Sequence, residues 1–254
     1  MNLRGTLQQS READLEKIQK IKKILFSINT NFYKAEPTIG ILRKTSDKYD
    51  FQWERDPSWK EDQDPPRPIT RREYIRLHPE IENTLDYSFS LSADDIIAQK
   101  IPMRVMGCTG IAKLFAKYAQ DEDTKLDCFV VYTANIKDLE RKKNGQGDII
   151  NGHQIIAVQF SDGVRLFDPG MTNGLQFYRD NNGQEIVVDI PGMLLGIELI
   201  SQNSKDPWAQ RQAGTVITSI EPSDRLEHIK SYKDLEKKYL INEFIRLRSG
   251  RQNG

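Results

Sequence analysis

The segment from His153 to Asp168 constrains the fold most, because its pattern is typical of a β-hairpin. Two largely apolar runs, residues 153–160 and 164–168, flank a Ser-Asp-Gly turn at residues 161–163. Two antiparallel strands begin a sheet, and a sheet is stable only where another layer covers its apolar face. We therefore expect an antiparallel sheet with helices packed on it.

The register of this hairpin decides whether His153 and Asp168 can meet. A two-residue turn at 162–163 would put Asp168 about 13 Å along the strand from His153, at ~3.4 Å per residue. A four-residue loop, 160–163, moves Asp168 opposite Ile155. It then lies within about 7–8 Å of His153 at Cα, a gap that side chains close. We therefore predict a four-residue loop or a bulge at this turn.

An apolar helical segment begins at Cys108, directly after Gly107. Apolar side chains recur at helical spacing on the same face as Cys108: Ile111, Ala112, Phe115, Tyr118 and Ala119. This spacing predicts a central helix packed on the sheet, with Cys108 in its first turn. A strand is expected around residues 129–133, between the helix and the hairpin.

Cys108, His153 and Asp168 have the residue types of a thiol nucleophile, a base and an orienting carboxylate. The free N–H groups and the positive dipole end of a helix's first turn favour the thiolate of a cysteine placed there. An imidazole can take the thiol proton and pass it to a leaving group, while a carboxylate fixes the tautomer of the imidazole. We therefore predict these three side chains as catalytic residues, with no cofactor and no metal.

At these residues the chain resembles the transglutaminase-like superfamily of cysteine enzymes, in which Gly-Cys opens a helix, Gly-His starts a strand and Asp-Pro follows. The matching pairs are Gly107-Cys108, Gly152-His153 and Asp168-Pro169. The resemblance covers roughly residues 93–173. It implies an α+β, transglutaminase-like or papain-like core with the cysteine on a central helix. It also implies acyl transfer on an amide of a protein or peptide substrate through a thioester, by a peptidase, deamidase or transamidase.

Two alternatives stay open. Cys108-Thr109-Gly110 is similar to the Cys-Ser-Gly helix opening of NlpC/P60-type cell-wall amidases, although the Asp-Pro at Asp168 argues against that family. The other alternative is a non-catalytic, protein-binding module on the transglutaminase-like fold, with a dead or buried thiol. Taken singly, each candidate residue also has an ordinary structural explanation. Ile155 stands where the superfamily usually has an aromatic residue, which leaves the substrate class open.

The other cysteine and histidine positions are weaker candidates. Cys128 alternates with apolar residues in a predicted strand, so we expect it in the core. His78 and His228 lie in polar or charged stretches and are expected at the surface. No cysteine and histidine have the spacing of metal ligands. Gln99, upstream of the cysteine, is a further and weaker candidate as an oxyanion donor.

The composition favours a globular enzyme over a nucleic-acid-binding or membrane protein. A chain of 254 residues can bury one large core, and its 37 basic residues balance 37 acidic ones, so charge indicates no partner. No apolar run is long enough for a signal peptide or a membrane span. Two cysteines, one of them a predicted free thiol, suggest a reducing compartment. We expect a cytoplasmic protein, or an effector exported without a cleaved signal peptide.

The N-terminal part of the chain predicts one helix and one long loop. Ser10 is expected to cap an amphipathic helix. Its inward residues are Leu15, Ile18, Ile21, Leu25 and Ile28. Residues 53–72, rich in proline and charge, predict a loop. Trp53 and Trp59 make it a candidate lid, although most such loops have no catalytic role.

The C-terminal part predicts strands at residues 185–190 and 216–220 and a terminal helix capped at Ser231. We divide the chain into residues 1–92, an N-terminal helical extension with the charged loop, and residues 93–254, a catalytic core that ends in the terminal helix. The two parts are expected to form one compact unit, with extra helices at both ends of an α+β core.

Overall fold

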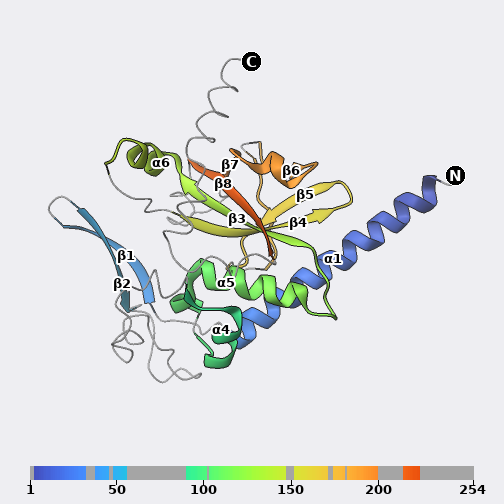
Figure 1. The fold of residues 1–254 in the computed structure, drawn as a ribbon, viewed down its shortest axis with the longest axis horizontal. Coiled ribbons are helices and arrows are strands. Elements are labelled where there is room, and N and C mark those ends of the chain that lie inside the picture. Colours follow the sequence, from blue (N-terminus) through green and yellow to red (C-terminus); the bar gives the residue numbers. More distant parts are fainter. Residues whose placement is uncertain are drawn as a thin grey trace, which may run out of the picture.

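The computed structural model of the chain describes residues 3–32, 38–45, 48–55, 90–101, 103–146, 152–170, 174–180, 182–199 and 214–223. Within them the fold is α+β, with a curled antiparallel sheet and a layer of helices against one of its faces (Figure 1). Among these residues, none of the helices combines the length and the apolar character that a membrane span requires.

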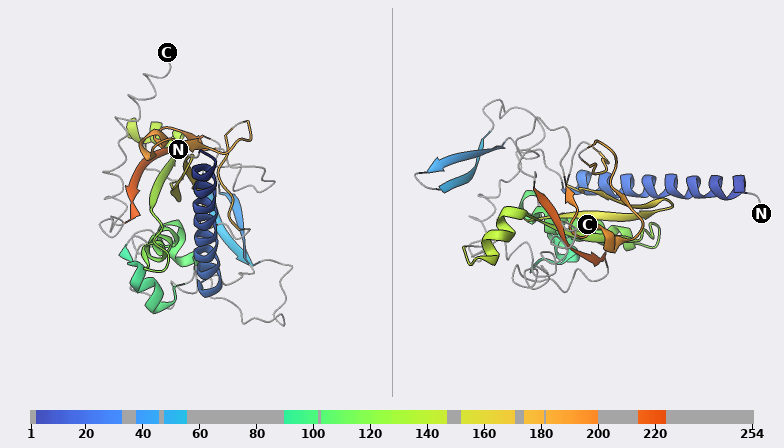
Figure 2. Two further views of the ribbon diagram at one scale, coloured as in Figure 1. Left: turned by 90° about the vertical axis from the view of Figure 1, so that its right-hand side faces the viewer. Right: turned by 90° about the horizontal axis from the view of Figure 1, so that it is seen from above.

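The sheet has six strands in the order β6-β5-β4-β3-β8-β7, all antiparallel to their neighbours. The strands are β3 (Cys128–Asn135), β4 (His153–Phe160), β5 (Gly163–Phe167), β6 (Val187–Val188), β7 (Glu198–Leu199) and β8 (Thr215–Pro222). The edge strands β6 and β7 have two residues each, so little unpaired backbone is left at either edge. A separate two-stranded sheet, β1 (Thr38–Thr45) and β2 (Lys48–Arg55), lies apart from the large one (Figure 2).

In the described part of the chain, four α-helices and one 3-10 helix accompany the strands. They are α1 (Leu3–Phe32), α4 (Ala93–Gln99), α5 (Met103–Gln120), α6 (Ile136–Lys143) and the 3-10 helix η1 (Pro191–Leu194). A capping box starts α4, because the Ser92 side chain accepts from the Asp95 N–H and the Asp95 carboxylate accepts from the Ser92 N–H. The side chain of Asn135, the last residue of β3, accepts from the Lys137 N–H and so turns the strand directly into α6.

Both faces of the large sheet are buried. Along β4, Ile156, Val158 and Phe160 pack in one core cluster with α1, α4 and α5. Ile155 and Ala157 face the other way, into a second cluster with residues of β5, β8 and η1. Burial on both sides explains why this strand is a nearly continuous apolar run instead of an alternating one.

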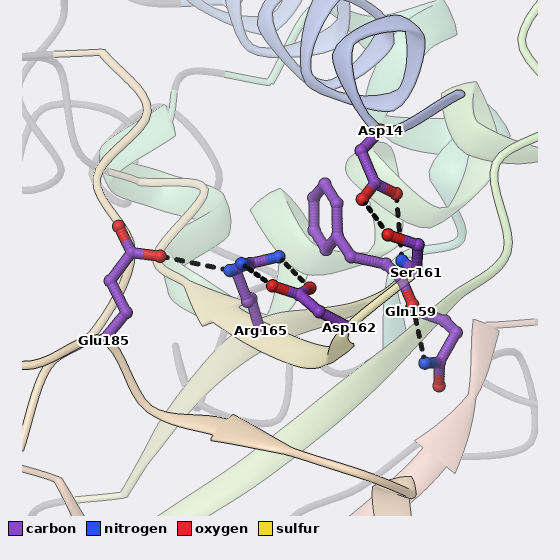
Figure 3. A network of polar contacts seen from close by, with 7 residues as sticks. Asp14, Gln159, Ser161, Asp162, Arg165 and Glu185 are labelled. Atoms are coloured by element: carbon purple, nitrogen blue, oxygen red, sulfur yellow. Dashed lines mark hydrogen bonds and ion pairs between the residues drawn. The ribbon is translucent and has the colours of Figure 1, made fainter. Parts of the chain in front are cut away.

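Helix α1 holds the turn between β4 and β5 (Figure 3). The Asp14 carboxylate accepts hydrogen bonds from the Ser161 backbone N–H and hydroxyl. The Lys17 ammonium donates to the Gln159 carbonyl at 2.8 Å. On the other side of the turn, the Arg165 guanidinium pairs with the Asp162 carboxylate at 2.6 Å. The turn is therefore tied both to α1 and to its own strand.

The predicted register of the hairpin is confirmed. Ile156 pairs with Phe167 and Gln159 with Val164, so the next position along the chain sets Asp168 opposite Ile155. The loop is shorter than the predicted four residues, because Phe160 and Gly163 also pair and leave only Ser161 and Asp162 in the turn. Gly163 closes this turn with φ 136°, a conformation that favours glycine.

The N-terminal predictions are correct in part. Ser10 lies inside α1, which already begins at Leu3, so it does not cap the helix. Ile21, Leu25 and Ile28 are buried as predicted, and α1 packs on α5. Leu15 is 59% exposed, whereas the neighbouring Asp14 and Lys17 contact the turn between β4 and β5, so Leu15 lies on the outer side of α1 at this point.

Two of the strands predicted outside the hairpin are present, and a third is shorter than predicted. Residues 129–133 and 216–220 lie in β3 and β8 as expected. The strand expected at 185–190 is reduced to β6 and a single bridge at Glu185, because Pro191 opens η1 directly afterwards. Trp53 is in β2 and not in a loop.

The aromatic residues Tyr49, Phe51 and Trp53, at every second position of β2, explain that strand. Strand β2 ends at Arg55, and residues 56–72 of the predicted loop, with Trp59, lie outside the described residues. The same holds for His78, His228 and the predicted terminal helix.

Candidate active site

Gly107 interrupts α5 and so makes Cys108 the first residue of the second helical segment. Gly107 has φ 61° and ψ −168°, a conformation outside the helical region that a residue with a side chain rarely adopts. The segment from Met103 ends there, and the next one runs to Gln120. Cys108 therefore lies in the first turn of a helix, as the sequence predicts, and its side chain is half-buried.

Alanine in place of Gly107 is expected to lower the free energy of unfolding by roughly 1–3 kcal/mol, the usual cost of a residue held in such a conformation. A Cβ at position 107 meets no atom within 4 Å, so the cost comes from the backbone and not from a clash. Urea unfolding measures the difference. Gly192→Ala is the matched control, because a Cβ there also has open space and the backbone is not in the left-handed region. Equal unfolding midpoints for the two variants would contradict the assigned strain.

His153 and Asp168 contact each other at the open end of the hairpin. His153 is the first residue of β4, and Asp168 directly follows β5. The His153 Nε2–H donates to Asp168 Oδ2 at 2.7 Å, and the two side chains are only 16% and 13% exposed. Asp168 Oδ1 accepts from the Gly170 N–H at 2.8 Å, which closes a turn across Pro169. Both carboxylate oxygens are therefore occupied, and the orientation of Asp168 is fixed.

Cys108 completes the constellation, because its thiol interacts with the His153 side chain, which lowers the pKa of the thiol. Since Nε2 engages Asp168, Nδ1 is the ring nitrogen left for the thiol. Burial alone would raise the pKa of Cys108. The hydrogen bond and charge of His153, together with the Gln154 backbone N–H, outweigh burial, so the pKa of this thiol lies below its ordinary value. The site therefore favours a thiolate beside an imidazolium.

The two partners shift in the matching directions. Burial lowers the pKa of His153, but the charge and hydrogen bond of Asp168 and then those of Cys108 outweigh it and raise the pKa well above the ordinary value. Burial raises the pKa of Asp168, but the charge and hydrogen bond of His153 and the Gly170 N–H bring it below its usual range. Asp168 is thus ionised and His153 readily protonated. The structure brings all three sequence-predicted residues into one chain of contacts.

Sequence reasoning missed two polar residues of this site, Thr109 and Gln154. The Gln154 backbone N–H contributes to the lowered pKa of the Cys108 thiol. The Gln154 side-chain amide donates to Thr109 Oγ1 at 2.8 Å, and both side chains are buried. The signal was present in the sequence, because a glutamine amid the apolar residues of a central strand needs a hydrogen-bond partner.

Two tyrosines also lie near the reacting groups. Burial and then the charges of Glu221 and Cys108 raise the pKa of Tyr132 on β3. Burial and then the charge of Asp168 raise the pKa of Tyr178. Both phenols therefore stay neutral at physiological pH.

The remaining candidates do not join the site. Cys128 is buried in the core, as predicted, and burial raises its pKa to about 12. Gln99 is exposed at the last residue of α4. The N–H group that acts on the Cys108 thiol belongs to the backbone of Gln154. Within the described part of the chain, no cluster of His, Cys, Asp and Glu has the arrangement of a metal site.

Comparisons with known proteins add no family to this description. No protein-family model, no curated protein and no solved structure shows a significant match to the chain. The functional conclusion therefore depends on the contacts among Cys108, His153 and Asp168.

Proposed function

We propose that the protein is a cysteine-dependent acyl-transfer enzyme that acts on an amide of a protein or peptide through a thioester, as a peptidase, deamidase or transamidase. The observation that supports this proposal is the chain of contacts from a thiol of lowered pKa to an imidazole and on to a fixed carboxylate. A helix that carries the cysteine and packs against an antiparallel sheet is also what a transglutaminase-like or papain-like core would have.

The proposed reaction begins with attack of the Cys108 thiolate on the amide carbonyl carbon. A carbon–sulfur bond forms, the carbonyl electrons move onto oxygen, and the C–N bond then breaks as His153 gives its proton to the leaving nitrogen. Water or an amine next attacks the thioester carbon and passes its proton to His153. The carbon–sulfur bond then breaks, and Cys108 leaves as the thiolate. Asp168 holds the imidazole and stabilises its protonated form throughout.

The start of the second helical segment supplies positive charge where the reaction needs it. Backbone N–H groups in the first turn of a helix have no partner within the helix, and the dipole adds partial positive charge there. With the thiol in this turn, we assign stabilisation of the oxyanion to these N–H groups. The break at Gly107 is what brings that helix start next to the nucleophile.

The two cysteines of the chain give an internal comparison. Cys128 has the environment of an inert structural thiol, buried and with a pKa raised to about 12. Cys108 is also shielded, yet its pKa is shifted in the opposite direction because His153 lies beside it. A purely structural cysteine has no need of a polarised imidazole. This contrast favours catalysis over the non-catalytic binding module.

Iodoacetamide at pH 6 is expected to alkylate Cys108 at least ~10-fold faster than Cys128, because alkylation requires the thiolate. His153→Ala should remove most of the Cys108 rate, since the hydrogen bond and charge that lower its pKa are lost. Peptide mass spectrometry of the folded protein measures both sites. Because burial also slows Cys128, the decisive comparison is wild type against His153→Ala. A Cys108 rate that is unchanged by this substitution would rule out an activated thiol.

The substrate class is tested by labelling with a glutamine-mimicking electrophile and with a cell-wall peptide electrophile. Covalent labelling of Cys108 by the glutamine mimic supports amide chemistry on a protein or peptide. Labelling by the cell-wall peptide alone would favour the amidase alternative. Failure of both reagents, together with slow alkylation, would favour the binding module.

A further inference from the structure

One buried side-chain hydrogen bond joins the residues that directly follow the proposed nucleophile and base. Gln154 Nε2 donates to Thr109 Oγ1 at 2.8 Å, and the two residues are 4% and 6% exposed. Thr109 follows Cys108 on α5, and Gln154 follows His153 on β4. The bond therefore spans the same two elements as the Cys108–His153 contact.

We propose that Thr109 and Gln154 are a pair of positioning residues that fix the separation between Cys108 and His153. The inference rests on the proposed function of that site. Neighbouring Cα atoms are about 3.8 Å apart, so a bond between these two side chains constrains the backbone within one residue of each reacting group. Helix α5 packs on β4, and the bond sets how the start of one meets the start of the other.

Gln154 holds the helix start at two points. Its side chain binds Thr109 at 2.8 Å, and its backbone N–H lowers the pKa of the neighbouring Cys108 thiol. An aliphatic residue would keep the backbone contact but would leave the Thr109 side chain without the amide. The geometry thus gives the glutamine a role that the apolar residues further along β4, Ile156 and Val158, do not need.

The burial of the pair makes the bond directional and persistent. Water does not replace a partner that is lost inside the protein, so each group depends on the other. A buried amide and hydroxyl are retained only where their bond is satisfied, and an apolar pair of similar size would fill the same space. The presence of the polar pair beside the reacting residues favours positioning over packing.

The test is the pH profile of Cys108 alkylation in Thr109→Val, Gln154→Met and the double variant. Each single variant should move the profile to higher pH and lower the rate at pH 6 by roughly tenfold, because the thiol loses its aligned imidazole. With a substrate, kcat should fall up to about 10²-fold, as expected when reacting groups are misplaced by about 1 Å. The double variant should be no worse than either single one, because both remove the same bond.

Two control variants separate positioning from general stability. Thr109→Ser keeps the hydroxyl and should retain the wild-type profile. Thr218→Val removes another buried hydroxyl, which donates to the Tyr132 carbonyl at 3.1 Å, and should also leave the profile unchanged. Thermal unfolding first confirms that each variant is folded. If Thr109→Val does not fold, Gln154→Met decides alone, because it keeps the backbone N–H of β4.

The outcomes distinguish the two proposals. Wild-type profiles in both single variants, or additive effects in the double variant, would overturn the positioning role while leaving the enzyme proposal intact. If Cys108 is alkylated as fast in the His153→Ala variant as in the wild type, the enzyme proposal is overturned, and the positioning role with it. Both proposals are supported if Thr109→Val and Gln154→Met shift the pH profile while Thr109→Ser keeps the wild-type profile.

Discussion

Serine in place of Cys108 will abolish acyl transfer, with a loss of rate on the order of 10⁶-fold, as for other triads whose nucleophile is removed. The substitution changes one atom and keeps the shape, so the free energy of unfolding should change by no more than about 1.5 kcal/mol. A hydroxyl is not ionised by the neighbouring imidazole as a thiol is, because its own pKa is far higher. Turnover of an amide substrate and urea unfolding measure the two effects separately.

Cys128→Ser is the matched control for this experiment. Cys128 lies in the core on β3 and has no part in the proposed reaction. Its substitution should leave kcat unchanged and should destabilise the fold, because it puts a hydroxyl into an apolar cluster. If Cys108→Ser turns over substrate at the wild-type rate, the thioester mechanism is wrong.

Asp168→Asn is expected to lower kcat by roughly 10⁴-fold, as in other triads that lose the carboxylate. The Gly170 N–H holds Oδ1 of residue 168 as an acceptor, so the new amide would turn its NH2 group toward His153 Nε2. Nε2 must then accept, and the proton of the neutral imidazole moves to Nδ1. The nitrogen that faces Cys108 can then no longer take the thiol proton.

The pH dependence distinguishes this effect from simple loss of structure. Activity of the wild type needs the Cys108 thiolate and the His153 imidazolium, so it falls below the pKa of the thiol and above that of the imidazole. Asp168 raises the pKa of His153, so Asp168→Asn should move the alkaline limb to lower pH. Asp162→Asn is the control on the same hairpin, because Asp162 pairs with Arg165 at the distant turn. A rate for Asp168→Asn within about tenfold of wild type would contradict the orienting role.

The parts of the site that local sequence determines were predictable. Gly107 before an apolar helix indicated a helix start at Cys108, because the pattern of one element is enough to place it. The hairpin register was predictable from the reach of side chains between His153 and Asp168, which excluded the alternative turn. Strand alternation likewise assigned Cys128 to the core.

The features that were missed depend on contacts between segments far apart in the chain. The bond from Gln154 to Thr109 exists only because α5 lies on β4, and no periodicity of either segment reports which helix covers which strand. The start of α1 was misassigned at Ser10, because a serine favours a cap but does not exclude seven further helical residues before it. The hairpin of β1 and β2 was not predicted, because the aromatic alternation of β2 runs directly into the proline-rich, charged segment that follows it and marks no boundary between the two.

The two-residue turn at Ser161 and Asp162 links the far end of the hairpin to the geometry of the reacting end. Surface turns normally accept insertions and deletions. Here the pairing of β4 with β5 starts at Phe160 and Gly163, and β4 runs roughly 25 Å from this turn to the reacting end. If a residue added here made the strands slip by one position, Asp168 would be displaced relative to His153 and every following side chain would change face. An insertion in this turn is therefore harmless only while Ile156 stays paired with Phe167.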